Sequence, residues 1–140
     1  MNTTPHTLAG YTSLKLIGVN PIGCVVAVIT HFVFDYVGEK GIVSVKDRVI
    51  YDVLPTAIAF IVVYFTGGIT DVGILLIGSI LGNLPDLIDK KLYLTILFPN
   101  KFKNTEYLHW QKVKFHPTEK QTKLIGVLAS MLIILISIVK

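Results

Sequence analysis

Apolar residues fill four long stretches of this chain, and polar or charged residues gather between them and at their ends. The stretches run from Ile22 to Tyr36, Val53 to Phe65, Val72 to Leu84 and Leu124 to Val139. These stretches are almost free of charged residues, which is typical of membrane helices. We therefore expect an all-α fold, an integral membrane bundle of about five helices.

The first 36 residues predict a helical hairpin that forms a short arm of this bundle. Thr4-Pro5 suits a helix start, with Thr at the N-cap and Pro at the first helical position, and the helix would run from His6 to about Ile17. It is too short and too polar to span a membrane alone. Gly18-Val-Asn-Pro21 predicts the turn, and Pro21 opens the second helix. His6 and His31 lie about 15–18 Å from this turn on opposite arms, at about 1.5 Å per residue, so they should return to the same level.

Later helix boundaries carry local signals of their own. Ser44-Val-Lys-Asp47 fits a capped helix start, and Thr118-Glu-Lys-Gln121 fits a capping box. Pro55 predicts a kink in the helix that follows the first of these. Gly67-Gly68 should end that helix, and Thr70 should cap the next one.

Composition agrees with a membrane protein of one domain, residues 1–140. Hydrophobic residues make up 52% of the chain and charged residues 16%, against about 25% charged in soluble domains. The mean hydropathy is +0.66. Cys24 is the single cysteine, which excludes an internal disulfide and a cysteine-based zinc site. Met1 to Leu14 contains no Lys or Arg, so a cleavable signal peptide is not expected.

The net charge of +4 comes from basic residues beside the apolar stretches, which indicates membrane topology and no nucleic-acid partner. Most Lys and Arg residues fall in two connections, the one before Val53 and the one between Asp89 and Leu124. These residues are Lys40, Lys46, Arg48, Lys90, Lys91, Lys101, Lys103, Lys112, Lys114, Lys120 and Lys123. The positive-inside rule places both connections in the cytoplasm, which predicts a multi-pass protein of the cytoplasmic (inner) membrane. Only Lys15 and Lys140 remain for the other side.

Histidine and aspartate residues should converge at the cytoplasmic end of the bundle. They are His6, His31, Asp35, Asp52, Asp86, Asp89, His109 and His116. His31 and Asp35 are four residues apart on one helix, and Asp86 and Asp89 are three apart, so each pair shares a face. Imidazole and carboxylate groups suit zinc, and manganese or iron as alternatives, without a thiolate. The number of ligand-type residues also leaves room for two metals.

Each of these residues also has a simpler interpretation. His6 could be a residue of the helix start, and His31 a buried hydrogen-bonding histidine. Asp86 and Asp89 could charge a helix end, although carboxylates at a C-terminal end oppose the helix dipole. His109 and His116 could be residues of the membrane interface. The convergence, and no single residue, favours a metal site.

Four motifs in order resemble those of the membrane-bound metal-dependent hydrolases (DUF457 type). They are Thr4-Pro-His-Thr-Leu-Ala-Gly10, Thr30-His-Phe-Val-Phe-Asp35, Gly82-Asn-Leu-Pro-Asp-Leu-Ile-Asp89, and the pair His109 and His116. The resemblance covers nearly the whole chain. It implies metal binding by His6, His31, Asp35, Asp86, His109 and His116, with Asp52 at an acidic position of the third helix. Relatives continue after Asp35 into Pro-His, whereas this chain has Tyr36-Val-Gly-Glu39.

Two functions follow as expectations. The first is a hydrolase whose cytoplasm-facing metal site acts on a phosphate ester or phospholipid, with Asp35 or Asp89 as ligand, general base or orienting residue. The second is a non-enzymatic membrane protein in which the polar cluster, or a metal, is structural. A transporter is disfavoured, because its polar residues should lie near the bilayer midplane and not at one end.

Overall fold

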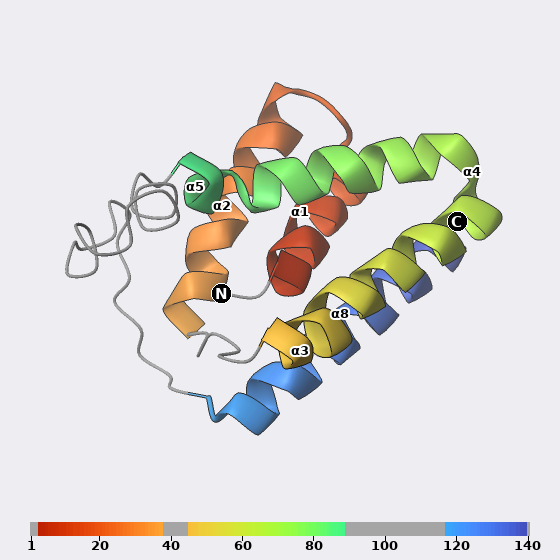
Figure 1. Ribbon diagram of the computed structural model, residues 1–140. Coiled ribbons are helices and arrows are strands. Elements are labelled where there is room, and N and C mark those ends of the chain that lie inside the picture. The colour runs from red at the N-terminus through yellow and green to blue at the C-terminus, as the bar shows by residue number, and fades with distance from the viewer. Residues whose placement is uncertain (1–2, 38–44, 89–116, 140) are drawn as a thin grey trace.

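The computed structural model describes residues 3–37, 45–88 and 117–139, and every element in these ranges is helical (Figure 1). The predicted all-α class is therefore confirmed. The elements are α1 (Thr3–Ile17), α2 (Pro21–Val37), α3 (Val45–Arg48), the π-helical turn η1 (Val49–Val53), α4 (Leu54–Gly82), α5 (Leu84–Ile88) and α8 (Glu119–Ile138).

α1 and α2 form the predicted hairpin. Gly18 makes the turn with φ 96°, a conformation that suits glycine, and its N–H donates to the Leu14 carbonyl at 2.9 Å. The side-chain oxygen of Asn20 accepts from the Gly23 N–H at 2.9 Å and so caps the start of α2. One detail differs: α1 begins at Thr3, so Thr4 lies inside the first turn and not at the N-cap.

α4 is two helical arms joined at Gly68. This residue has φ 71° and ψ −168°, which interrupts the helix, and the chain turns back there, as the yellow-to-green bend in Figure 1 shows. Gly67 is also required at this turn, because a Cβ there would lie 2.2 Å from a carboxylate oxygen of Asp71. The predicted break at Gly67-Gly68 is confirmed. The second arm resumes directly after Gly68, so Thr70 lies within its first turn instead of capping it.

Pro55 disturbs the first arm of α4, as predicted, but the disturbance is a π-helical turn. In a regular α-helix the ring of Pro55 would clash with the carbonyl four residues earlier. The chain widens to η1 directly before it, and the Leu54 N–H donates to the Val49 carbonyl, five residues back. The Asp52 carbonyl accepts from the Thr56 hydroxyl at 2.7 Å. A side chain thus satisfies an acceptor in the disturbed region.

α8 runs parallel to the first arm of α4. Lys123 near the start of α8 donates to Asp47 of α3 at 2.7 Å, and Thr66 meets Ser137 near the far end at 2.9 Å between hydroxyl oxygens. The capping box at the start of α8 is confirmed, since Thr118 and Gln121 exchange both side-chain-to-backbone hydrogen bonds.

We call the two ends of the bundle the site end and the turn end. The site end holds the start of α1, the end of α2, α5 and the start of α8. The turn end holds the Gly18 and Gly68 turns and the last residues of α8, near which Figure 1 marks the C-terminus. Asp71 lies at the turn end and pairs there with Lys15 at 2.6 Å.

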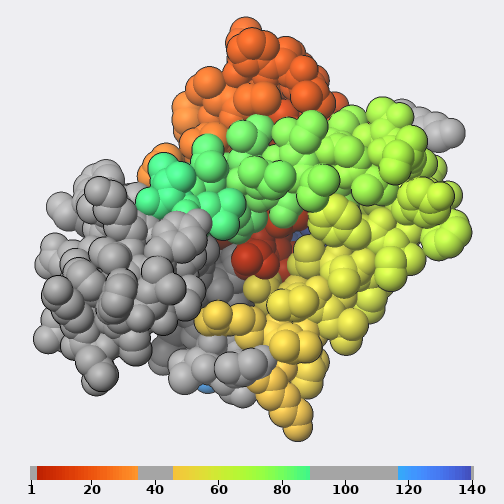
Figure 2. All heavy atoms as spheres, turned by 45° about the horizontal axis from the view of Figure 1, so that its top comes forward, coloured from red at the N-terminus to blue at the C-terminus, as the bar shows by residue number. Residues whose placement is uncertain are grey.

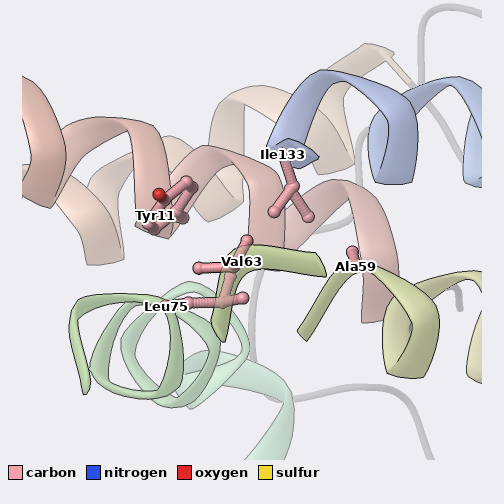
Figure 3. Packing of buried hydrophobic residues seen from close by; sticks show 5 residues of the cluster. All are labelled: Tyr11, Ala59, Val63, Leu75 and Ile133. Carbon is pink, nitrogen blue, oxygen red and sulfur yellow. The ribbon is translucent and has the colours of Figure 1, made fainter. Parts of the chain in front are cut away.

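The centre of the bundle is α1, the helix with the most hydroxyl groups. It packs against α2, both arms of α4 and α8. Its Tyr11 lies in a small apolar cluster with residues of α4 and α8, shown in Figure 3: Ala59, Val63, Leu75 and Ile133. In Figure 2 only a small red patch of α1 is visible between the green and yellow parts of α4.

Burial in this molecule is inverted relative to a soluble protein. Large apolar side chains cover the outside of α2, α4 and α8, including Phe65, which is 79% exposed. Buried polar residues are numerous, and they are Thr4, His6, Thr7, Ser13, His31, Asp52, Asp71, Asn83, Asp86, Thr122, Ser130 and Ser137. Two helical segments, Lys46–Gly82 and Glu119–Ile138, are long and apolar enough to cross a membrane.

Candidate metal centre

His6 is held at the site end by close packing between α1 and the second arm of α4. Gly78 and Gly82 are one helical turn apart and face α1: a Cβ on Gly82 would lie 2.1 Å from the His6 carbonyl oxygen. A Cβ on Gly10 of α1 would lie 2.0 Å from the Gly78 carbonyl oxygen. Only glycine lets the two backbones approach this closely, as in the Gly-x-x-x-Gly contacts of membrane helices.

Hydrogen bonds between α1 and the second arm of α4 complete this contact. The Thr7 hydroxyl lies 3.0 Å from the Ser79 hydroxyl, and the Asn83 amide donates to Thr7 at 3.3 Å. Asn83 also donates to the Ser79 carbonyl at 2.8 Å, at the point where α4 ends. The Thr7 hydroxyl is therefore satisfied in the interior, and this network fixes the height of His6 along the second arm.

His31 arrives at the same level from α2, as the hairpin geometry predicts. The His6 and His31 rings are stacked with their centroids 4.2 Å apart and an interplanar angle of 28°. Both side chains are fully buried. Two imidazolium ions stacked at this distance would repel each other strongly in a buried site, so the arrangement favours at least one neutral ring with a lone pair to donate.

The orientation of His31 is set by the end of α4. Its Nδ1 atom lies 2.8 Å from the Gly82 carbonyl oxygen. A carbonyl can only accept, so Nδ1 carries the proton and, in the neutral ring, Nε2 carries the lone pair. This contact is the arrangement that orients metal-binding histidines in proteins, where the second ring nitrogen donates to a carbonyl or carboxylate.

Asp86 faces this nitrogen from α5. The Asn83 backbone (φ −102°, ψ 1°) ends α4, and Pro85 and Asp86 belong to the separate short helix that follows. Asp86 therefore does not oppose the dipole at the end of α4, as a continuous helix would require. Its carboxylate is buried, and its Oδ1 lies 3.8 Å from His31 Nε2.

His6, His31 and Asp86 form a group that could hold a metal ion. One ligand atom from each residue lies within 4.8 Å of the other two. Two atoms bonded to one zinc ion at about 2.0–2.1 Å are at most about 4.2 Å apart. The pair His31 and Asp86 meets this limit as it stands, and the whole group needs only small side-chain rotations.

The chemistry of the group suits a divalent cation. Two imidazole nitrogens and one carboxylate oxygen form a donor set of the kind that binds zinc and other first-row metals. The carboxylate also supplies negative charge away from the screening of bulk water, because all three residues are at most 2% exposed. These features support a metal ion without identifying which one.

The other predicted ligands fall into two groups. Asp52 is among the described residues and lies in η1, outside the group of three. Asp35 lies in α2 one turn after His31, but its side chain is outside the described residues. Asp89, His109 and His116 are outside the described residues altogether, so their assignment as ligands stays a prediction.

The Asp52 carboxylate accepts hydrogen bonds from the first turn of α1. It accepts from the Thr3 and Thr4 N–H groups at 3.1 and 2.9 Å and from both threonine hydroxyls. The first N–H groups of a helix lack partners within the helix and carry partial positive charge. A carboxylate from η1 thus caps α1 from outside, and it positions the turn that carries His6. The prediction that Asp52 is a metal ligand has no support among these contacts.

We expect Asp52→Asn to destabilise the fold by about 1–2 kcal/mol, the range for a lost helix cap with its charge, and to weaken metal binding only indirectly. Thermal unfolding and metal titration of the purified protein measure the two effects. Asp47→Asn is the matched control, because this acid lies in the same segment but forms a partly exposed ion pair with Lys123. Complete loss of metal binding with unchanged stability would instead make Asp52 a ligand.

Four residues that position the site were missed at the sequence level: Thr7, Gly78, Gly82 and Asn83. The spacing Gly78-x-x-x-Gly82 was a usable signal, since small residues one turn apart in an apolar helix predict close helix packing. The role of the Gly82 carbonyl had no signal, because every residue carries one.

No protein-family model, no curated protein and no solved structure matches this chain.

Proposed function

We propose that this protein is an integral membrane metalloprotein whose His6, His31 and Asp86 bind one divalent cation, and that it hydrolyses a phosphate ester at the membrane surface. The observation that carries the proposal is the buried group of three with His31 already oriented by the Gly82 carbonyl. Two imidazole rings and a carboxylate gathered within reach of one ion are a donor set of the kind that divalent cations bind.

The inverted burial supports the membrane part of the proposal. Leu16, Phe65 and Ile69 are each more than 70% exposed on the outside of the bundle, and twelve polar residues of the described ranges are buried inside. In water this arrangement would expose a large apolar surface and promote aggregation. A bilayer suits this arrangement, because the hydrocarbon contacts the apolar side chains and the polar groups pair inside the bundle.

Each residue of the proposed site has its own role in the hydrolysis. A bound cation would act as a Lewis acid toward the phosphoryl oxygen of the ester. His31 would present Nε2 toward the cation, held by its bond from Nδ1 to Gly82, and Asp86 would balance part of the charge. Asp35 or Asp89 is the proposed general base. Zinc is the proposed cation, with manganese or iron as alternatives.

Turnover tests the reaction. Purified protein in vesicles that contain phosphatidic acid is expected to release phosphate only when zinc, manganese or iron(II) is supplied. Asp86→Asn should abolish the release, and Asp71→Asn should retain it, because Asp71 is a buried carboxylate at the turn end that pairs with Lys15. Metal binding without turnover, on this substrate and on simple phosphate esters, would contradict the hydrolase proposal.

One observation favours the structural alternative. His6, His31 and Asp86 tie α1, α2 and α5 together and are nearly inaccessible, as the ligands of a closed structural site would be. Cobalt substitution separates the two functions. An open coordination position should give a visible spectrum that shifts when azide or phosphate is added, whereas a closed site should give a spectrum that neither anion changes.

The proposed orientation places the site end in the cytoplasm. In a Cys24→Ser background, Asn20→Cys at the turn end and Lys46→Cys at the site end are both exposed positions. A membrane-impermeant maleimide added to intact cells should label Asn20→Cys and leave Lys46→Cys unlabelled until the cells are opened. The reverse pattern would contradict the positive-inside assignment.

A further inference from the structure

An apolar groove runs along the outside of α1 and ends beside the metal centre. Its volume is about 480 Å³, within the range of ligand-binding pockets. α1 forms the floor, α2 forms one wall and α8 forms the other. The residues that line it include Leu8, Ser13, Leu16, Ile17, Val26, Thr30, Phe34 and Leu132.

The groove has a direction that the hairpin fixes. α1 and α2 are antiparallel, and His6 and His31 stack at one level. Phe34 therefore lies at the site end of the groove, Val26 lies near its middle, and Ile17 lies beside the Gly18 turn. From Leu8 to Ile17 the floor extends about 14 Å at about 1.5 Å per residue. One end therefore lies at the site end of the bundle, and the other lies near the Gly18 turn.

Phe34 connects the groove to the metal centre. It lines the groove, and its ring meets His6 edge to face with the centroids 6.2 Å apart. His6 in turn stacks on His31. A molecule lying in the groove with its end at Phe34 would thus have that end one side chain away from the ligands.

The lining is mostly apolar, and its three hydroxyl residues are Thr12, Ser13 and Thr30. The Ser13 hydroxyl donates to the Ala9 carbonyl and the Thr30 hydroxyl to the Ala27 carbonyl, both at 2.8 Å. These hydroxyls are satisfied by their own helices and offer no donor to a ligand. Leu16 and Leu132 line the open side and are 79% and 46% exposed. In a bilayer this side would open toward the lipid chains.

We propose that the groove holds one alkyl chain of the substrate, so that the substrate is a lipid whose phosphate ester lies at the metal centre. The inference rests on the proposed hydrolase function and names its substrate class. A chain that leaves bilayer hydrocarbon for this groove gains mainly packing contacts, because lipid tails are as apolar as the lining. The groove therefore sets the position of the ester more than the affinity.

Photolabelling tests the chain site without requiring a metal. The probe is dodecyl phosphate with a diazirine on its last carbon, added to chelator-treated protein in phosphatidylcholine vesicles. We expect labels to gather near Leu16 and Ile17, and excess unlabelled dodecyl phosphate to suppress them severalfold. Labels spread over the whole apolar exterior, without suppression, would overturn the proposal.

Two neighbouring valines provide the matched variants. Val26 lines the groove, whereas Val25 does not line it and is 58% exposed. Val26→Trp should fill the middle of the groove and remove the competable label beyond it, near Leu16 and Ile17, while Val25→Trp should keep that label. Helical circular dichroism checks that both variants fold. Equal labelling of the two variants would contradict the groove assignment.

The result of photolabelling the groove can be distinguished from the result of measuring metal binding. Saturable labelling of the groove in a protein that binds no metal would keep the chain site and overturn the hydrolase function. Metal binding with labelling that does not saturate would keep the metal centre and overturn the groove as its substrate site.

Discussion

Replacing His31 with alanine is expected to weaken binding of a divalent cation by more than about 100-fold. Loss of a group that only orients a ligand costs about 10–100-fold in metal affinity, and His31 is proposed to be a ligand itself. The measurement is competition for zinc between the purified protein and a chromophoric chelator. His31→Gln fills a similar volume and should show the same loss, which separates ligand loss from a cavity in the core.

The control for this prediction is Thr7→Val. Thr7 is buried one residue after His6 and contacts Ser79 and Asn83, but it supplies no ligand atom. This variant should lose some stability through its lost hydrogen bonds and keep its affinity for zinc within a few-fold. Equal zinc affinity in the wild type, His31→Ala and His31→Gln would rule out His31 as a ligand.

The second large effect is expected at the glycine contact between α1 and α4. A Cβ on Gly78 would lie 2.5 Å from the Tyr11 backbone nitrogen, and the neighbouring atoms are also backbone. The helices must therefore move apart, and the cost should exceed the about 1–3 kcal/mol of an overpacked side chain. Gly78→Ala should unfold at a much lower temperature than the wild type and should bind zinc weakly, because His6 moves with α1.

Gly73 provides the matched control on the same arm of α4. A Cβ there meets nothing within 4 Å, and alanine favours a helix by about 0.5–1 kcal/mol over glycine. Gly73→Ala is thus expected to be neutral or stabilising. If Gly78→Ala and Gly73→Ala had the same unfolding temperature, the close approach of α1 to α4 would be wrong.

The parts of the site that were predictable depend on local geometry. His6 and His31 meet because each lies a similar number of residues from the turn at Gly18, and the rise per residue is the same in α1 and α2. The break at Gly67-Gly68 and the capping box at Thr118 also follow from residue type alone. These features need no knowledge of which helices pack together.

The role of Asp52 shows where local reasoning stops. A carboxylate near the start of an apolar helix looks like a ligand when all other acids and histidines gather at the same end. Its partners, Thr3 and Thr4, are 48 or more residues away in the sequence and become visible only once α1 packs against η1. The same limit applies to Gly78 and Gly82, whose spacing predicts a close contact without saying that α1 is the partner.

The buried position of α1 was also beyond the sequence pattern. A short helix with several hydroxyl groups is expected at a surface in a soluble protein. Here Thr4 bonds to Asp52, and Thr7 to Ser79, which places these hydroxyls inside the bundle. The apolar helices can then face outward, which is the arrangement that a bilayer favours.

Metal content is the measurement that tests the central claim most directly. Wild-type protein purified without chelators should contain about one divalent cation per chain, if the three described ligands form one site. Asp86→Asn should contain almost none, and Asp71→Asn, which changes a buried carboxylate at the turn end, should match the wild type. Metal-free wild-type protein that also fails to bind zinc, manganese or iron(II) on addition would contradict the account.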